Sequence, residues 1–189
     1  MRRSRCHLEL INLEFAQKDI EDAERLEIKS ERVSEEINNI KESIKIKIFE
    51  KYNEIAKSFL EKRDFQQSLE YFNKSVAVMK NAPKLEVIKV YLNRIATYIG
   101  MDQFSLVDSE ATRILTLLFK QKRLASAKGD LDLLQKLKDI EIMLYVRKGF
   151  ALSKMNRILE SLEEYQKALE LRPNDEKIKN NIIELKKNL

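Results

Sequence analysis

Small and large residues recur at fixed spacings from Ile142 to Asp175. Large side chains stand at Tyr145, Leu152, Ile158 and Tyr165, and small residues stand at Gly149, Ser161 and Ala168. Two antiparallel helices can approach closely where Gly149 and Ser161 leave room, and the large side chains then fill the remaining gap. Pro173 cannot continue a helix, so it ends the second one. The pattern predicts a helical hairpin.

The same spacing occurs twice more, earlier in the chain. Between residues 49 and 80, the large positions are Tyr52, Phe59, Phe65 and Phe72, and the small ones are Ala56, Ser68 and Ser75. Asp64 lies between the two predicted helices, where an N-cap is expected. A third unit, from Ile88 to Leu117, carries Val107 where a small residue is usual, so its helices are expected to splay slightly. The pattern therefore predicts three hairpins.

Two further helical segments complete the C-terminal part. An insertion at about 118–138 keeps helical spacing on both sides of Gly129, which predicts two lengthened helices that project beyond the hairpins. A last helix, at about 175–188, is expected to start at Asn174 as N-cap. Its predicted apolar face consists of Ile178, Ile182, Ile183 and Leu185. Such a helix covers the last hydrophobic edge of a stack of hairpins.

The first 48 residues predict a helical extension ahead of a repeat domain that spans residues 49–189. Apolar residues of this extension recur at heptad-like spacing, at Leu26, Val33, Ile37, Ile40 and Ile44. This stripe fits a short coiled coil or a partner-facing helix, and the simpler alternative is a helix that packs back on the hairpins. Residues 7–15 fit either a strand or the start of a helix.

Composition supports an all-α fold and narrows the function. Only three Gly and two Pro occur in 189 residues, which is few for the turns of a sheet. The net charge is +5, a mild excess whose clearest cluster, Met1–Arg5, is expected to be a solvated terminus. Aromatic residues occupy core positions and do not interleave with basic ones, so the pattern does not favour nucleic-acid binding.

The sequence lacks the residues of a catalytic or metal site. His7 is the only histidine, and its neighbour Cys6, the only cysteine, is not placed to form a nucleophile–base pair with it. There is no zinc-ligand set and no Gly-rich phosphate loop. We therefore expect a non-enzyme with no cofactor, metal or small-molecule substrate. A lone cysteine, no signal peptide and no apolar run of membrane-spanning length predict a cytoplasmic protein.

The hairpin spacing resembles that of the tetratricopeptide repeat (TPR) family, whose repeats are helical hairpins of about this length. The resemblance implies a solenoid of three hairpins whose first helices line a groove for a protein partner. The groove residues predicted to bind a peptide are Asn53, Lys57, Lys89, Asn93, Met143 and Arg147. Glu50, Leu60, Thr97 and Phe150 are also expected to face the groove.

Co-chaperone TPR domains bind the acidic C-terminal tail of heat-shock chaperones with Lys and Asn side chains and one Arg, and the resemblance implies that function here. The chain agrees with their pattern at Asn93 and Arg147. It departs from the pattern at Asn53 and Met143, each in place of Lys, and at Lys57, in place of Asn. Arg and Lys supply charge-assisted hydrogen bonds to a carboxylate, and Asn both donates and accepts.

A finer resemblance is to the family of the axonemal dynein assembly factor known as the dyslexia-susceptibility candidate protein. It rests on two sequence segments, Val90-Tyr-Leu-Asn-Arg94 and Tyr145-Val-Arg-Lys-Gly149, and on the insertion between them. The resemblance covers about residues 49–185. It implies a cilium-associated helper of heat-shock chaperones in dynein assembly. Members of that family carry a CS domain before the repeats, which residues 1–48 do not match. The alternative is a structural subunit of a ciliary or centrosomal assembly, which uses the N-terminal stripe and the insertion helices.

Overall fold

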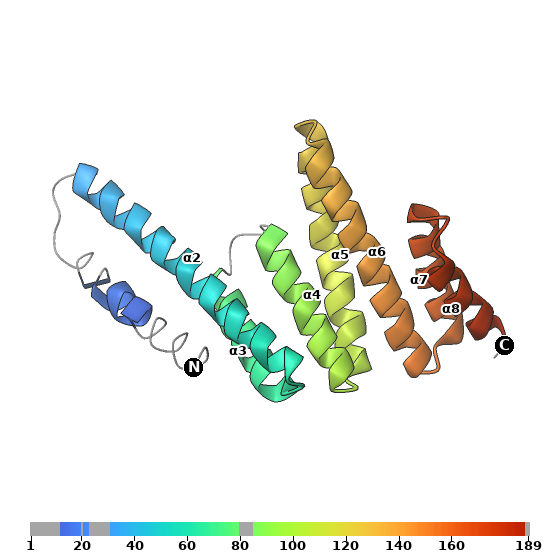
Figure 1. Ribbon diagram of the computed structural model, residues 1–189. Coiled ribbons are helices and arrows are strands. Elements are labelled where there is room, and N and C mark those ends of the chain that lie inside the picture. Colours follow the sequence, from blue (N-terminus) through green and yellow to red (C-terminus); the bar gives the residue numbers. More distant parts are fainter. Residues whose placement is uncertain (1–11, 20, 23–30, 80–84, 188–189) are drawn as a thin grey trace. The chain divides into compact units, whose positions relative to one another are not determined.

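The computed structural model describes residues 12–19, 21–22, 31–79 and 85–187, and all its regular elements are helices (Figure 1). Within these residues no strand occurs, which agrees with the predicted all-α class. The described part of the ambiguous 7–15 segment, residues 12–15, is helical. Cys6, His7 and the basic segment Met1–Arg5 lie outside the described residues.

The chain divides into two compact units, Met1–Arg94 and Ile95–Leu189. The first contains α2 (Glu31–Glu61), α3 (Phe65–Val78) and most of α4 (Leu85–Gly100). Its core is formed by Ile48, Ile55 and Phe59, with Leu13, Ile44, Tyr52, Tyr71 and Val78 packed against them. Because α2 is one continuous helix, the domain boundary predicted at residue 48 falls inside it.

The heptad-like stripe divides along α2. Ile44 packs against the core of the first unit, whereas Ile40 is exposed. Leu26 lies outside the described residues, and so does the side chain of Val33. The described C-terminal end of the stripe therefore packs back on the first hairpin.

The second unit contains α5 (Phe104–Ala127), α6 (Leu131–Lys154), α7 (Ile158–Leu171) and α8 (Glu176–Lys186). The buried residues of its C-terminal core are Ile142, Tyr165, Ala168, Ile178, Ile182 and Leu185. Three of them belong to α8, so this helix covers the end of the α6–α7 hairpin as predicted. The prediction was wrong about Ile183, which is 54% exposed because it lies about 100° around the helix from Ile182.

The N-cap of α8 also differs from the prediction. Asp175, and not Asn174, caps the helix: its Oδ1 accepts hydrogen bonds from the backbone N–H groups of Lys177 (3.1 Å) and Ile178 (3.2 Å). At the start of α3 the cap is the predicted residue, since Asp64 accepts from the N–H of Gln67.

Four helices end in the same kind of turn, which pattern reasoning did not anticipate. In each, one residue adopts a left-handed conformation, with φ of 60°, 56°, 67° and 59° at Arg63, Asp102, Gly129 and Asn156. The next N–H donates to the carbonyl five residues back, as from Asp64 to Phe59 (3.0 Å) and from Arg157 to Leu152 (3.0 Å). This is the Schellman arrangement, which satisfies carbonyls left over at a helix end. The α5–α6 tip at Gly129 is therefore built like the turns within the hairpins.

The close approach of α6 and α7 takes place at Gly149. The Ser161 hydroxyl donates a hydrogen bond to the Gly149 carbonyl oxygen at 2.7 Å. Ser161 is therefore small enough to let the two helices approach closely and also links them as a hydrogen-bond donor. A Cβ added at Gly149 would lie 3.0 Å from two ring carbons of Tyr165 and 3.3 Å from the carbonyl oxygen of Ser161. Tyr165 is itself buried, so its ring has little room to move.

A network of charged side chains also ties α5, α6 and α7 together. Lys148 of α6 lies 3.2 Å from the buried Glu164 of α7 and 3.7 Å from Asp108 of α5. Arg157, at the start of α7, pairs with Asp108 at 2.8 Å and also with Glu160. Glu164 is the most buried charge of this network, and its pairing with Lys148 links α7 to α6.

We predict that Gly149→Val will lower the free energy of unfolding by about 1–3 kcal/mol, because the added methyl groups overpack the contact with Tyr165. Chemical denaturation will measure the change. Gln135→Val is the matched control, since it adds the same side chain at an exposed position of α6 and is expected to cost less than about 0.5 kcal/mol. A loss at position 149 no larger than the loss at position 135 would show that the close approach to Tyr165 does not set the cost, since Gly→Val does not worsen helix propensity.

Candidate functional site

The six predicted groove residues are divided between the two units. Asn53, Lys57, Lys89 and Asn93 belong to the first unit, and Met143 and Arg147 belong to the second. A groove shared by all six stays a prediction. Thr97, which was also expected to face the groove, is fully buried, so that assignment was wrong.

In the first unit the predicted groove residues are two exposed lysines and two half-buried asparagines. Lys57 and Lys89 are exposed, and the described residues provide no ion-pair partner for either. Asn53 and Asn93 are half-buried. The side-chain oxygen of Asn53 is buried and has no hydrogen-bond partner among the described residues. A buried acceptor without a donor is unfavourable by about 1–3 kcal/mol.

In the second unit Met143 and Arg147 line one pocket, which has a volume of about 210 Å³. They stand one turn apart on α6. The facing wall is the start of α8, which contributes Lys177, Ile178 and Asn181. The remaining lining residues are Ile142, Val146, Arg172 and Asp175. We call this the α6–α8 pocket.

The α6–α8 pocket is cationic. Its lining includes the three basic residues Arg147, Arg172 and Lys177 and one carboxylate, Asp175. Arg172 is paired already, with Asp139 at 2.7 Å and with Asp175 at 3.6 Å. Burial lowers the pKa of the Arg147 guanidinium, because desolvation disfavours its charge. An anion in the pocket would compensate for that desolvation.

Sequence reasoning assigned Met143 and Arg147 to a binding surface but missed Arg172, Lys177 and Asn181. The predicted groove included only the first helix of each hairpin. Arg172 belongs to the α7–α8 turn, and Lys177 and Asn181 belong to α8. A signal was present: Lys177 and Asn181 are four residues apart, and so share one side of a helix. Ile178 and Ile182 mark the neighbouring, buried side.

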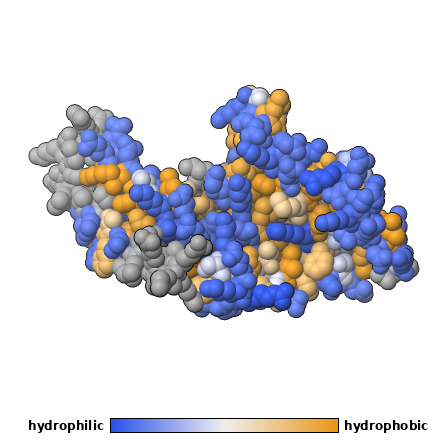
Figure 2. Space-filling model, in the orientation of Figure 1, coloured by the Kyte–Doolittle hydropathy of each residue, from blue (hydrophilic) through white to orange (hydrophobic). Residues whose placement is uncertain are grey.

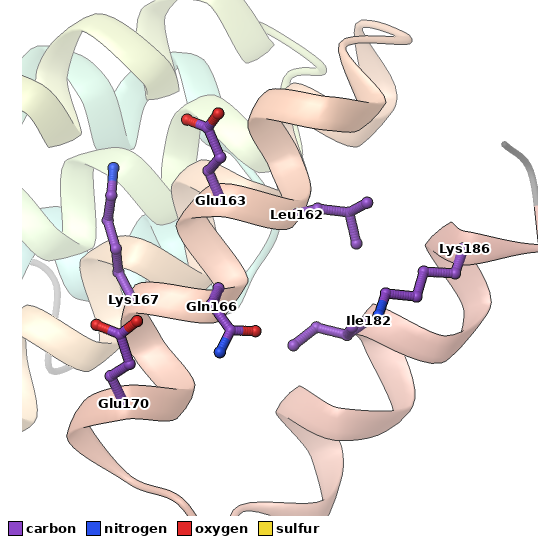
Figure 3. Close-up of a pocket in the computed structure, with 7 residues that line it drawn as sticks. All are labelled: Leu162, Glu163, Gln166, Lys167, Glu170, Ile182 and Lys186. Carbon is purple, nitrogen blue, oxygen red and sulfur yellow. The ribbon is translucent and has the colours of Figure 1, made fainter.

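A second pocket in this unit lies between α7 and α8 and measures about 440 Å³ (Figure 3). Leu162 of α7 and Ile182 of α8 point toward one another across it. Its other lining residues are two acidic, two basic and one amide side chain: Glu163, Glu170, Lys167, Lys186 and Gln166. Because these charges balance, this pocket has no preference for an anion. The α6–α8 pocket is therefore the better candidate for an acidic ligand.

Among the described residues, no group of three or more His, Cys, Asp or Glu side chains is arranged to hold a metal ion. None of the described helices is both long enough and apolar enough to cross a membrane.

Comparison with known proteins agrees with the fold. The family model described as tetratricopeptide repeat matches residues 144–175, which cover most of α6–α7 and end at the N-cap of α8. A search of curated proteins finds no match for this sequence.

Solved TPR domains share the architecture at low sequence identity. The TPR domain of Arabidopsis OM64 is 16% identical, with a TM-score of 0.58, over 77% of this chain and 99% of that one. The first TPR domain of Spaghetti (RPAP3), bound to the HSP90 peptide SRMEEVD, is 15% identical, with a TM-score of 0.54, over 72% and 89%. The first TPR domain of human RPAP3 is 16% identical, with a TM-score of 0.53, over 72% and 87%. The chain therefore has the all-α, TPR-like helical-hairpin fold.

We predict that Asp175→Ala will lower the free energy of unfolding by about 1 kcal/mol, because two N–H groups at the start of α8 lose their acceptor. Hydrogen exchange should quicken most in the first turn of α8. Asp175→Asn keeps an acceptor and is expected to lose only a few tenths of a kcal/mol. If both variants lost the same stability, the charge of Asp175, and not its capping bonds, would be what holds the wall of the α6–α8 pocket.

Proposed function

We propose that this chain is a non-catalytic adaptor whose TPR groove binds an acidic C-terminal peptide of a protein partner, such as the tail of a heat-shock chaperone. The observation that carries the proposal is the α6–α8 pocket, in which the predicted ligand residue Arg147 lies among further cations. A peptide carboxylate there would form charge-assisted hydrogen bonds, which are about twice as strong as neutral ones. The HSP90 peptide bound to the structurally similar Spaghetti domain is an example of such a ligand.

The finer part of the proposal is the cellular setting. We place the adaptor in the cytoplasm, with a ciliary association, where it would help chaperones to assemble a larger complex such as axonemal dynein. This part is supported by the resemblance at residues 90–94 and 145–149 alone. It is tested separately, by asking whether loss of the protein reduces dynein heavy chains in axonemes while leaving their cytoplasmic precursors.

The proposal predicts that a peptide ending in Glu-Glu-Val-Asp will bind more tightly than the same peptide with an amidated C-terminus. Arg147→Ala should weaken binding of the free acid about 10- to 100-fold, because a hydrogen bond to a charged group contributes about 1.5–3 kcal/mol. Isothermal titration calorimetry will measure both affinities. Arg113→Ala is the matched control, since Arg113 is an exposed arginine of α5 that pairs with Glu110. Equal affinity for acid and amide would overturn the proposal.

A second candidate is a structural subunit that makes contacts through the α5–α6 tip. Both helices have 24 residues against 14 in α7, and their joined end extends past α7 (Figure 1). Near this tip Phe119, Leu124 and Leu131 are 64%, 56% and 77% exposed. Figure 2 shows apolar surface at the tip beside hydrophilic surface. Exposed large apolar side chains on a projecting element are typical of a contact with another protein.

This candidate predicts that the triple variant Phe119→Ser/Leu124→Ser/Leu131→Ser will lose its localisation to centrosomes or the ciliary base, while its peptide affinity stays unchanged. Fluorescence microscopy of the tagged chain in ciliated cells will measure localisation. The control replaces three other exposed apolar residues, Leu106, Leu159 and Ile183, with Ser. Normal localisation of the tip variant would exclude the tip as the assembly contact.

A further inference from the structure

α8 has two flanks, and they face different pockets. Lys177 and Asn181 line the α6–α8 pocket, whereas Ile182 and Lys186 line the α7–α8 pocket (Figure 3). Ile178, Ile182 and Leu185 are buried in the core, and Ile178 and Ile182 also border the α6–α8 pocket and the α7–α8 pocket, respectively. The packing of these three residues sets the rotation of α8 and so determines which of its polar side chains reaches each pocket.

Lys177 is the uncommitted cation of the α6–α8 pocket. Two other lysines of this helix region form local pairs, Lys179 with Glu176 at 2.8 Å and Lys187 with Glu184 at 2.7 Å, and Lys186 lines the α7–α8 pocket. Arg172 is held by Asp139 and Asp175. Lys177 has no ion pair with any described residue. An anion that enters the pocket therefore need not displace an existing partner to engage Lys177.

The position of Lys177 complements that of Arg147. One residue lines the pocket from α8 and the other from α6, and Ile142, Val146 and Ile178 form apolar lining beside them. Apolar walls exclude water and strengthen an ion pair between them. A carboxylate has two oxygens, so it can accept hydrogen bonds from a guanidinium on one side and an ammonium on the other.

We propose that Lys177 is a ligand-binding residue, and that Lys177 and Arg147 together hold the terminal carboxylate of an acidic peptide in the α6–α8 pocket. This inference rests on the proposed peptide-binding function. It extends the predicted groove, which uses only the first helix of each hairpin, to the helix that covers the stack. α8 is then part of the binding site as well as a cover for the core.

Met143 provides a direct test because it lines the same pocket from α6 and is 41% exposed. A lysine at position 143 would bring an ammonium group to the pocket without the help of α8. Where Lys177 is present, the added lysine faces a like charge and is expected to raise affinity by no more than about twofold. Where Lys177 is absent, it should restore the lost binding. The two substitutions are therefore expected to be strongly non-additive, which a double-mutant cycle reveals.

The experiment titrates the full chain with the free-acid and amidated Glu-Glu-Val-Asp peptides. Lys177→Ala is expected to weaken free-acid binding about 10-fold and to leave amide binding unchanged. The control Lys179→Ala, which removes the same charge two residues away, should stay within about twofold of the wild type. Lys177→Ala/Met143→Lys should return to within about threefold of the wild type. Circular dichroism melting checks that each variant folds.

The outcomes separate this inference from the proposed function. If the wild type does not distinguish acid from amide, the proposed function fails and the inference falls with it. If the wild type distinguishes them and Arg147→Ala weakens binding, but Lys177→Ala binds like the wild type, only the inference is overturned. It is also overturned if Met143→Lys raises affinity by the same factor with and without Lys177, since the two cations would then act at separate places.

Discussion

The contact between α6 and α7 at Gly149 is the constraint on which the rest of the second unit depends. Gly149 has no side chain to separate it from the Tyr165 ring, and its carbonyl oxygen accepts the Ser161 hydroxyl. This contact, together with the pairing of Lys148 to Glu164 and Asp108, sets the position of α6. Two other positions of α6, 143 and 147, then line the pocket toward α8. The geometry of the candidate site thus follows from close packing beside it.

α8 combines a stabilising role with a proposed binding role because a helix presents different residues on different sides. Ile178, Ile182 and Leu185 remove apolar surface from water at the end of the α6–α7 hairpin. The same packing places Lys177 in the pocket that Arg147 also lines, and places Lys186 in the α7–α8 pocket. A substitution in the buried stripe is therefore expected to change both stability and binding, whereas one at Lys177 should change binding alone.

Much of the fold was predictable because small and large residues repeat at fixed spacing. That regularity identified Gly149 and Ser161 as positions of close approach, and it identified Met143 and Arg147, which do line one pocket. It failed for Thr97, which is fully buried, and for Ile183, which is exposed. The assignment of Thr97 extended a repeat offset to a position where the packing differs. Ile183 was counted as core by composition alone, although Ile178, Ile182 and Leu185 already fill the buried side of α8.

The sequence by itself determined the helices, the hairpins and the residues of closest approach, because these depend on local spacing and on side-chain size. Only the tertiary structure decided which cations share a pocket. Arg147 and Lys177 are 30 positions apart and belong to helices separated by α7, so no local pattern connects them. Their presence in the lining of one pocket depends on the rotation of α8, which the burial of three apolar side chains sets. The left-handed conformations of Arg63 and Asp102 were likewise found only in the structure, since the sequence has no glycine at either turn to indicate them.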